Sequence, residues 1–365
     1  MTDEQFTPEW FSKPADSLLS LMRRRNVTAS HLATTLDGGL DLLRGLLAGS
    51  LAVDERRAEC LAAVLGGTSR FWLMRQANYE RALDRAVAAV FETEGEDWLQ
   101  RVPIPGGNTP RRLTEDQKRE QLRRRLAFFN VANLRAWNRR YGSLRSETQF
   151  RTSPTLLSDE GAISMWLRQG ELEAALLSTR PWDPVKLGEK LPEIRALSKI
   201  GQPTRFIPKL KDLCAQAGVA IVVKRAPKDC RASGATRLIA PDKAMILLSF
   251  RFRTDDQFWF TVFHEIGHLL LHDAKTFIDD EETFQDERER EANEFASSCI
   301  IPEARQAEFE RLTPARNTVL RFSVSAGIGA GLTVGQMQHR KIIGHERLNS
   351  LKRRWTWEDI EPVLS

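Results

Sequence analysis

The chain has 365 residues, 41% of them hydrophobic and 28% charged, which supplies enough apolar side chains for packed cores and excludes a disordered chain. The most apolar stretch, 40–53, is interrupted by Asp41, Arg44 and Gly45, and the acidic N-terminus lacks the order of a signal peptide. The four cysteines lie far apart, which is typical of free thiols in a reducing compartment. We therefore expect a soluble, cytoplasmic protein of two or three domains with no membrane partner.

The first hundred residues predict consecutive short helices with little strand signal. Thr28 can cap the second helix, Asp37-Gly38-Gly39 forms a turn after it, and Gly49 ends the third helix. The prolines and glycines of 102–110 predict a linker. The expected helices are 14–26, 28–36, 40–49, 54–65 and a long helix that Thr68 opens.

The positive charge is concentrated in 101–150, which has 12 basic and 4 acidic residues, against 11 and 15 in 1–100. This basic block can attract nucleic acid. It can equally be the solvated face of a helix, because Leu122, Leu126 and Phe129 recur at helical spacing among the arginines. We favour the solvated helix and keep both interpretations. Residues 114–200 predict a second helical segment, with breaks at 153–154, Gly170 and 180–184.

The first convincing strands follow Gly218. The segments 219–224, 235–240 and 244–250 are rich in β-branched and aliphatic residues and are separated by turn residues. Three strands between helical stretches indicate a small sheet packed against helices. The predicted fold class is therefore mainly α with a small sheet, α+β.

The strongest chemical signal is His264-Glu265-Ile266-Gly267-His268, on a helix that Asp255 or Asp256 can open. Residues four apart lie about 40° apart on a helix, so both imidazoles point the same way, as two ligands of one divalent ion must. Glu265 then stands where it can hold and deprotonate a water molecule for attack on an amide carbonyl. The pattern predicts a hydrolytic metal site.

A third ligand is expected from a second helix, 286–302, which offers two glutamates. Glu289 shares its face with small residues that suit close approach to the first helix, whereas Glu291 shares its face with charged residues and is expected in solvent. Glu289 is therefore the candidate ligand. Asn293, one turn further on, is a candidate hydrogen-bond partner of a ligand histidine.

Three other histidines stay open. His272 is either a further ligand or, as we favour, a cation at the C-terminal end of its helix. His339 and His345 could assist as electrophiles, but nothing in their spacing argues for it.

With these residues assembled, the chain resembles the ImmA/IrrE family of zincin-like metallopeptidases. The matching segments are FWFTVFHEIGHLLLH at 258–272, E-x-x-A-N-x-F-A at 289–296 and IIP at 300–302. The N-terminal part, with FWLMRQANYERAL at 71–83, resembles the HigA branch of Xre-type helix-turn-helix proteins. The resemblance implies such a domain at 1–100, a helical connecting segment at 101–200 and a zincin metallopeptidase domain at 201–365.

The resemblance also implies a zinc-type peptidase with metal on His264, His268 and Glu289 and with Glu265 as general base. Two imidazoles and a carboxylate suit Mn²⁺ or Fe²⁺ as well as Zn²⁺. Some relatives cleave or inactivate a DNA-binding repressor. We expect the peptide substrate along a sheet edge, with the strand at 244–250 as the natural candidate.

The predicted helix-turn-helix departs from its pattern where bases would be read. Gly39, Leu40, Asp41, Arg44 and Gly45 provide one arginine and one repelling carboxylate, whereas base readout needs several polar side chains. The candidate DNA contacts are Arg44 and the arginines of the basic block, Arg123, Arg124 and Arg125. Two alternatives stay open: the module binds DNA weakly as a homodimer with help from the basic block, or it binds a protein.

Two functions follow. The first is a metal-dependent endopeptidase that cleaves a regulatory protein, either a DNA-binding repressor or a toxin–antitoxin component, and so controls transcription or stress response. The second is a DNA-binding repressor or antitoxin whose zincin domain is a non-catalytic sensor or scaffold. The peptidase requires Glu265, whereas the repressor tolerates its loss and depends on Arg44 and on 123–125.

Overall fold

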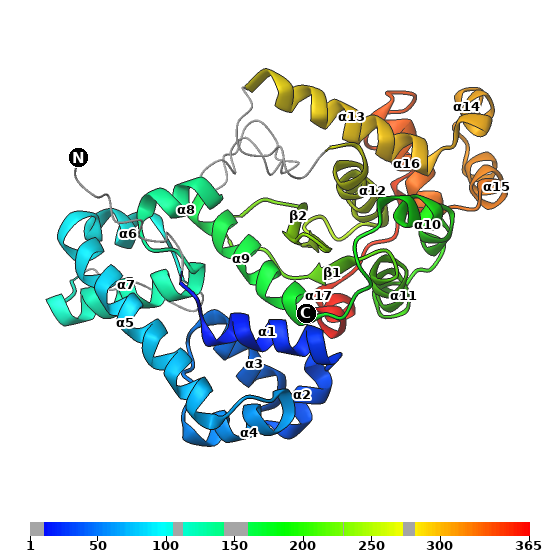
Figure 1. Cartoon of the computed structure of the whole chain (residues 1–365). Coiled ribbons are helices and arrows are strands. Elements are labelled where there is room, and N and C mark those ends of the chain that lie inside the picture. Colours follow the sequence, from blue (N-terminus) through cyan, green and yellow to red (C-terminus); the bar gives the residue numbers. More distant parts are fainter. Residues whose placement is uncertain (1–10, 105–111, 142–159, 229, 273–281) are drawn as a thin grey trace. The chain divides into compact units, whose positions relative to one another are not determined.

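A computed structural model describes residues 11–104, 112–141, 160–228, 230–272 and 282–365 (Figure 1). Contacts gather these residues into two compact units. The N-terminal unit contains the described residues up to 141 together with 160–178, and the C-terminal unit contains 179–365. The predicted segment 101–200 is thus shared between the two units, and the three-domain division stays a prediction.

The N-terminal unit begins with the helices that the sequence predicts. Thr28, Asp54 and Thr68 each accept a hydrogen bond from a backbone N–H in the first turn of the helix that they cap. Gly49 ends its helix with a positive φ of 75°, a conformation that favours glycine. The helices are α1 (Pro14–Arg25), α2 (Ala29–Thr35), α3 (Gly39–Ala48), α4 (Glu55–Leu65) and α5 (Ser69–Thr93).

Four further helices complete this unit: α6 (Gly95–Arg101), α7 (Glu115–Phe129), α8 (Leu134–Tyr141) and α9 (Glu160–Leu176). Leu122, Leu126 and Phe129 are fully buried on α7, as the helical spacing predicts. The break expected at Gly170 is wrong, since α9 continues through it. Gly170 is itself buried, and packing outweighs the cost of about 1 kcal/mol that glycine imposes in a helix. The break at 153–154 and most of the predicted linker lie outside the described residues.

The C-terminal unit surrounds a three-stranded sheet with helices. Its strands are β1 (Val219–Val223), β2 (Gly234–Ala240) and β3 (Lys243–Leu248). Its principal helices are α10 (Pro184–Leu197), α11 (Pro203–Ala215), α12 (Asp255–Leu271), α13 (Glu282–Ile300), α14 (Glu303–Glu310), α15 (Arg316–Ala326), α16 (Ala330–His339) and α17 (Trp357–Ile360). Mainly helical structure with a small mixed sheet confirms the predicted fold class.

The strand order corrects one expectation about the substrate. Among the described strands the order is β1-β3-β2, with β3 parallel to β1 and antiparallel to β2. The strand predicted at 244–250 is therefore the central strand, with both of its backbone edges paired. The order of the strands was not predictable from the sequence, because all three segments are similarly apolar. The outer strands of the described sheet are β1 and β2.

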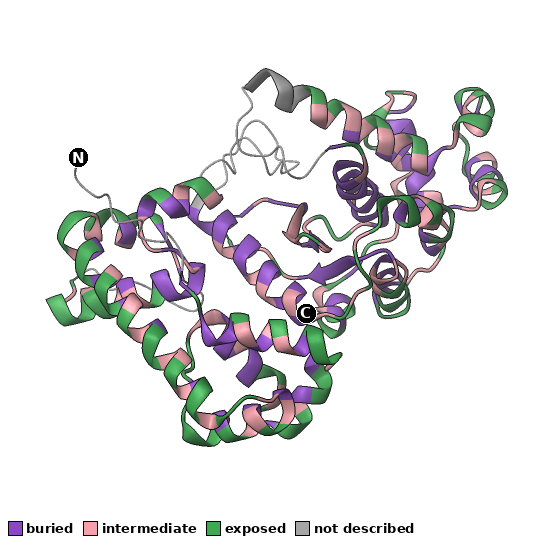
Figure 2. Ribbon diagram, viewed as in Figure 1, coloured by how far each residue is buried: buried purple, intermediate pink, exposed green. Residues whose placement is uncertain are grey.

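Helix α12 lies in the middle of the apolar core of this unit. Its residues 255–269 are all buried except Gln257 (Figure 2). Trp259 and Phe263 pack in one cluster with β1, β3 and α11. A helix that is apolar on nearly every side is typical of a protein interior. The polar residues of α12 are consequently buried as well.

A separate cluster packs the first helices of the N-terminal unit, where Leu32, Leu43, Leu61 and Trp72 are fully buried. Among the described residues no single helix is long and apolar enough to cross a membrane. The two helices α15 and α16 pass such a test only when taken together, across a bend of 110°.

Candidate metal centre

Two helices of the C-terminal unit approach each other closely at the site. α12 packs on α13, and Gly267 lies at their contact. A Cβ atom added at Gly267 would come within 3.0 Å of the Phe295 ring and 3.3 Å of the Ala292 Cα. Glycine within the sequence HEIGH and a small residue on α13 therefore permit the short separation of the helix axes. This close approach brings side chains of α13 within reach of both α12 histidines.

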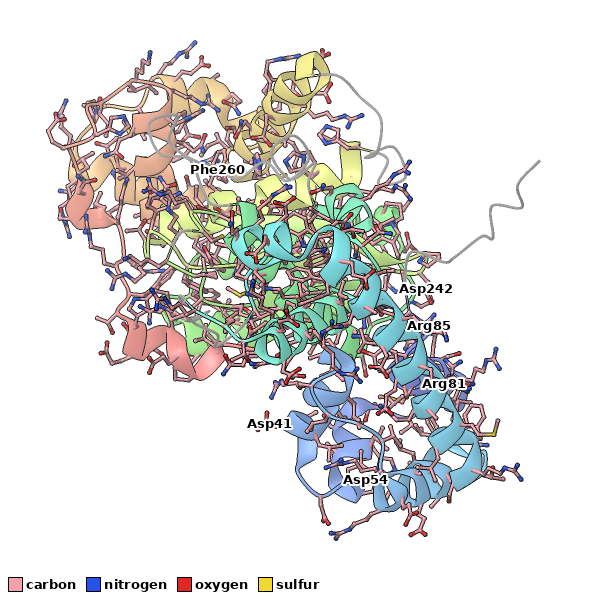
Figure 3. The ribbon with its side chains drawn as sticks, turned by 90° about the vertical axis from the view of Figure 1, so that its left-hand side faces the viewer. Asp41, Asp54, Arg81, Arg85, Asp242 and Phe260 are labelled. Carbon is pink, nitrogen blue, oxygen red and sulfur yellow. The ribbon has the colours of Figure 1, made fainter. Side chains whose placement is uncertain are left out.

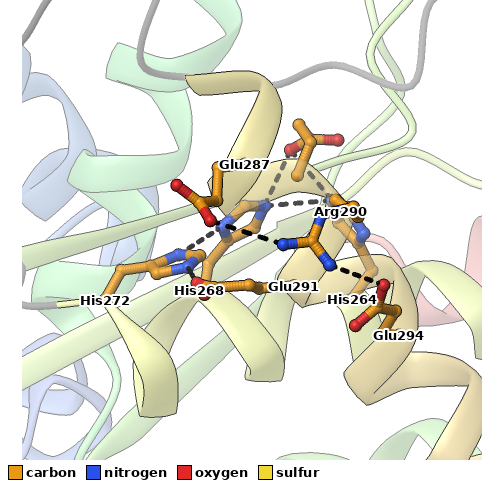
Figure 4. Close-up of polar contacts among 8 residues, drawn as sticks. His264, His268, His272, Glu287, Arg290, Glu291 and Glu294 are labelled. Carbon is orange, nitrogen blue, oxygen red and sulfur yellow. Dashed lines mark hydrogen bonds and ion pairs between the residues drawn. The ribbon is translucent and has the colours of Figure 1, made fainter. Parts of the chain in front are cut away.

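The ligand candidates converge in that contact. The Nε2 atoms of His264 and His268 lie 3.0 Å apart, and Glu289 Oε1 lies 3.0 Å from His268 Nε2 and 3.4 Å from His264 Nε2 (Figure 4). Their ligand atoms all lie within 4.8 Å of one another. His264 and His268 are buried, and Glu289 is partly buried, with 23% of its side chain exposed.

The electrostatics of the group are those of a carboxylate between imidazoles. Burial by itself would raise the pKa of Glu289, but the hydrogen bonds from His264 and His268 outweigh it and lower that pKa to about 2. Burial lowers the pKa of His268, against the opposing effect of Glu289. A carboxylate and neutral imidazoles are the states in which these groups bind a metal.

Glu265 lies beside this group in a different environment. It is buried at 3% exposure, and burial, followed by repulsion from Glu289, raises its pKa well above the usual value. A Cβ atom added at Gly234, the first residue of β2, would come within 2.6 Å of Glu265 Oε1. The strand thus meets the carboxyl group directly. The contact of Gly234 with Glu265 was not predictable from the sequence, because the two residues lie far apart along the chain.

His272 is the C-cap residue of α12, at the end of the helix where a cation was expected. It is not part of the convergent ligand group, and burial lowers its pKa, which disfavours a cation at the helix end. Its Nδ1 atom lies 3.0 Å from His268 Nδ1, and its Nε2 atom lies 3.1 Å from Glu291 Oε2 (Figure 4). Glu291, expected in solvent, is half-exposed and has this partner.

A cleft of about 780 Å³ reaches the ligand group at Glu289 and is also lined by Asn293, Gln306 and His339, among others. Asn293 lies beside Glu289 there, and among the described residues no hydrogen bond joins it to His264 or His268. His339 arrives from α16 and lies 6.0 Å, between ring centroids, from Phe260, which itself stacks on His264 at 6.2 Å. Figure 3 labels Phe260 in this region. His345 lines a smaller adjoining pocket with Phe260 and His339.

The residues predicted to contact DNA lie in the N-terminal unit, and three of the four, Arg44, Arg123 and Arg125, have internal partners. Arg44 donates to Glu173 at 2.9 Å and to the exposed Asp41 at 2.8 Å; Asp41 is labelled in Figure 3. Arg123 forms an ion pair with Asp84.

Arg125 is the clearest departure from the proposed basic surface. It is 1% exposed and donates to the Val102 carbonyl at 2.6 Å, whereas Arg124 beside it is exposed. Arg125 therefore supports the packing of this unit, because a buried guanidinium needs acceptors from the protein.

The donor set fits a divalent metal. Two neutral imidazoles and a carboxylate, brought together on two helices, leave further coordination positions open, as in a catalytic zinc site. The three converging ligand atoms beside the buried Glu265 fit the metal site of a zincin-like metallopeptidase.

Comparison with known protein families gives a more specific result than the class of site. Residues 214–328 match the sequence model of the IrrE N-terminal-like domain, Peptidase_M78, which spans the sheet, α12 and α13. The match confirms the predicted resemblance to the IrrE family over residues 214–328. It does not reach the N-terminal unit, where the helix-turn-helix stays a prediction. No curated protein and no solved structure match the chain.

Proposed function

We propose that the C-terminal unit is a metal-dependent endopeptidase in which His264, His268 and Glu289 hold the ion. The observation that carries this proposal is the convergence of three ligand atoms beside the buried Glu265. A bound Zn²⁺ would supply a Lewis acid for the peptide carbonyl and lower the pKa of nearby water, and Mn²⁺ or Fe²⁺ also suits the donors.

Glu265 moves the proton in this proposal. Burial, and then repulsion by Glu289, raises the pKa of its carboxyl group well above the usual value, which makes its carboxylate a stronger base. Glu265 takes a proton from the water that attacks the carbonyl carbon. It then delivers that proton to the nitrogen of the leaving amine and ends in its starting state.

The outer strand β2 is the surface that we propose for the substrate. An extended peptide can add to an outer strand through backbone hydrogen bonds. β2 begins at Gly234, in contact with Glu265, so such a peptide would pass beside the general base. This role replaces the one expected for 244–250.

The substrate class follows from the resemblance. We propose a regulatory protein, either a DNA-binding repressor or a toxin–antitoxin component, whose hydrolysis controls transcription or stress response. In support, α2 and α3 are consecutive short helices joined at 36–38, where the helix-turn-helix is expected. DNA binding and homodimer formation belong to this proposal.

The test separates chemistry from scaffolding with one substitution. Glu265→Gln removes the general base and none of the ligands, so the variant should keep its zinc and lose at least about 100-fold in hydrolysis rate. Zinc per chain is measured by elemental analysis, and cleavage is measured by mass spectrometry on a peptide library digested from a bacterial proteome. Glu289→Ala is the variant expected to lose zinc.

Either of two results would contradict the peptidase. The first is zinc-loaded wild-type protein that cleaves nothing, and the second is equal cleavage by Glu265→Gln. The first would favour the alternative function, a repressor or antitoxin with a non-catalytic zincin domain.

A further inference from the structure

A line of side chains leads away from the ligand group towards the surface. It runs from His268 Nδ1 to His272 Nδ1 over 3.0 Å, and from His272 Nε2 to Glu291 Oε2 over 3.1 Å (Figure 4). The side chain of His272 is 4% exposed and that of Glu291 is 45% exposed. His268 is a ligand candidate and begins the line with its Nδ1 atom, whereas His272 and Glu291 are not part of the ligand group.

The direction of the hydrogen bonds follows from the ligand role of His268. Its Nε2 atom faces His264 and Glu289 and must carry no proton when it binds a metal. The proton of neutral His268 is then on Nδ1, which donates to His272 Nδ1. Neutral His272 must in turn carry its proton on Nε2, which donates to Glu291. Each nitrogen or oxygen of the line is therefore either a hydrogen-bond donor or an acceptor, and the two hydrogen bonds run in the same direction.

His264 has no such support. Its Nδ1 atom is buried and lacks a hydrogen-bond partner within the part of the chain that the structure describes. His264 is held by burial and by its stacking on Phe260. The two ligand histidines are thus positioned differently, one by packing and one by hydrogen bonds.

We propose that His272 and Glu291 are positioning residues, which fix the tautomer and ring orientation of His268 and thereby raise the metal affinity of the site. This inference rests on the proposed metal site and adds two residues to it. A ligand imidazole whose second nitrogen donates to a fixed acceptor is a stronger and better oriented ligand, and loss of such a partner costs about 10–100-fold in affinity. Glu291 extends the effect by fixing the ring of His272.

The test measures zinc affinity of the full chain by competition with a chromogenic chelator. His272→Phe keeps the bulk of the ring and removes the acceptor, so its zinc affinity should fall about 10–100-fold. His272→Asn places an amide oxygen near the position of Nδ1, and it should recover most of that loss. Glu291→Ala should weaken binding less than His272→Phe does.

The matched control is Glu294→Ala on the same helix. Glu294 is also exposed and contacts Arg290 at 2.9 Å, and the structure gives it no contact with the histidine line. Its zinc affinity should equal that of the wild type. The visible spectrum of Co²⁺-loaded protein provides a second readout, which should change in His272→Phe and return towards wild type in His272→Asn.

The outcomes separate this inference from the proposed function. Wild-type protein that binds no zinc would overturn the metal site itself. Zinc bound with equal affinity by wild type, His272→Phe and Glu294→Ala would overturn only the positioning role. Equal losses in His272→Phe and His272→Asn, with an unchanged Co²⁺ spectrum, would also overturn it and assign His272 to packing.

Discussion

Burial has opposite outcomes at two neighbouring carboxyl groups because their partners differ. Glu289 receives hydrogen bonds from two imidazoles, which lower its pKa to about 2 despite burial. At Glu265, burial and then repulsion by Glu289 raise the pKa. One glutamate is thereby kept as a charged ligand, and the other is kept ready to exchange a proton.

A third buried carboxyl group, Asp255, predicts how stability depends on pH. Burial and then repulsion by Asp256 raise its pKa to about 7. The folded chain therefore holds this proton more tightly than the unfolded chain, whose aspartates have a pKa near about 4. The stabilisation is complete below about pH 4 and is lost as pH rises through about 7, with a slope of up to about 1.4 kcal/mol per pH unit.

This pH dependence is checked by urea unfolding at several pH values, with the wild type and Asp255→Asn compared. The asparagine can keep the oxygen that accepts from the Asp256 and Arg353 N–H groups, each at 3.0 Å. The free energy of unfolding of the variant relative to the wild type should increase between about pH 4 and about pH 7. A pH-independent difference would show that Asp255 does not titrate in this range.

The sequence predicted which three candidate ligands lie together, because the spacing that unites them is local. Helical phase alone brings His264 and His268 together, and it distinguishes Glu289 from Glu291 on α13. The same helical phase placed Glu291 in solvent. The phase of α13 alone does not show that His272, at the end of α12, lies next to Glu291. This contact depends on how α12 and α13 pack on each other, and the spacing of residues along the chain does not show that packing.

At the scale of elements, the site depends on the separation of α12 and α13. Gly267→Ala would place a methyl group against the Ala292 backbone and the Phe295 ring. We expect a loss of about 1–3 kcal/mol in the free energy of unfolding, together with weaker zinc binding, because Glu289 is moved away from the histidines.

The matched control is Gly188→Ala on α10, where an added Cβ atom meets nothing within 4 Å. This substitution should stabilise the protein by about 0.4–1 kcal/mol and leave zinc binding unchanged. Denaturant unfolding and zinc competition on both variants measure the two effects. Wild-type zinc affinity in Gly267→Ala would show that the helix separation does not control the site.

The fold was predictable where capping residues mark the elements and less so where packing decides. Thr28, Asp54 and Thr68 marked three helix starts correctly. Gly170 was predicted to break a helix because glycine has a low helix propensity. Packing of α9 against the rest of its unit outweighs that propensity, and this packing is not visible in the local sequence. The position of β3 in the middle of the sheet was hidden because strand order is set by long-range pairing.

At the scale of the whole molecule, metal should act on one unit. The two apolar clusters consist of residues of different units, and the ligand group belongs to the C-terminal one. A ligand that binds only the folded state stabilises that state by about 2.7 kcal/mol at 100 times its dissociation constant. Zinc removal should therefore destabilise the C-terminal unit selectively.

Hydrogen exchange measured with and without a chelator distinguishes the units. Chelation should speed exchange in β1, β3 and α12, and it should leave α3 and α4 as they were. The Glu289→Ala variant should show the faster exchange with or without chelator. Equal acceleration in both units would mean that they unfold as one.

The outer position of β2 has a consequence for the sequences that the protein could recognise. Successive side chains of a strand point to opposite faces, so a peptide added to β2 would turn every second side chain towards the same side of the sheet. The pairing of β2 with β3 holds Gly234 against Glu265, and this would fix the register of such a peptide relative to the bond that the proposed peptidase cuts. Aligned cleavage sites would then show residue preferences at alternate positions, with the positions between them free to vary.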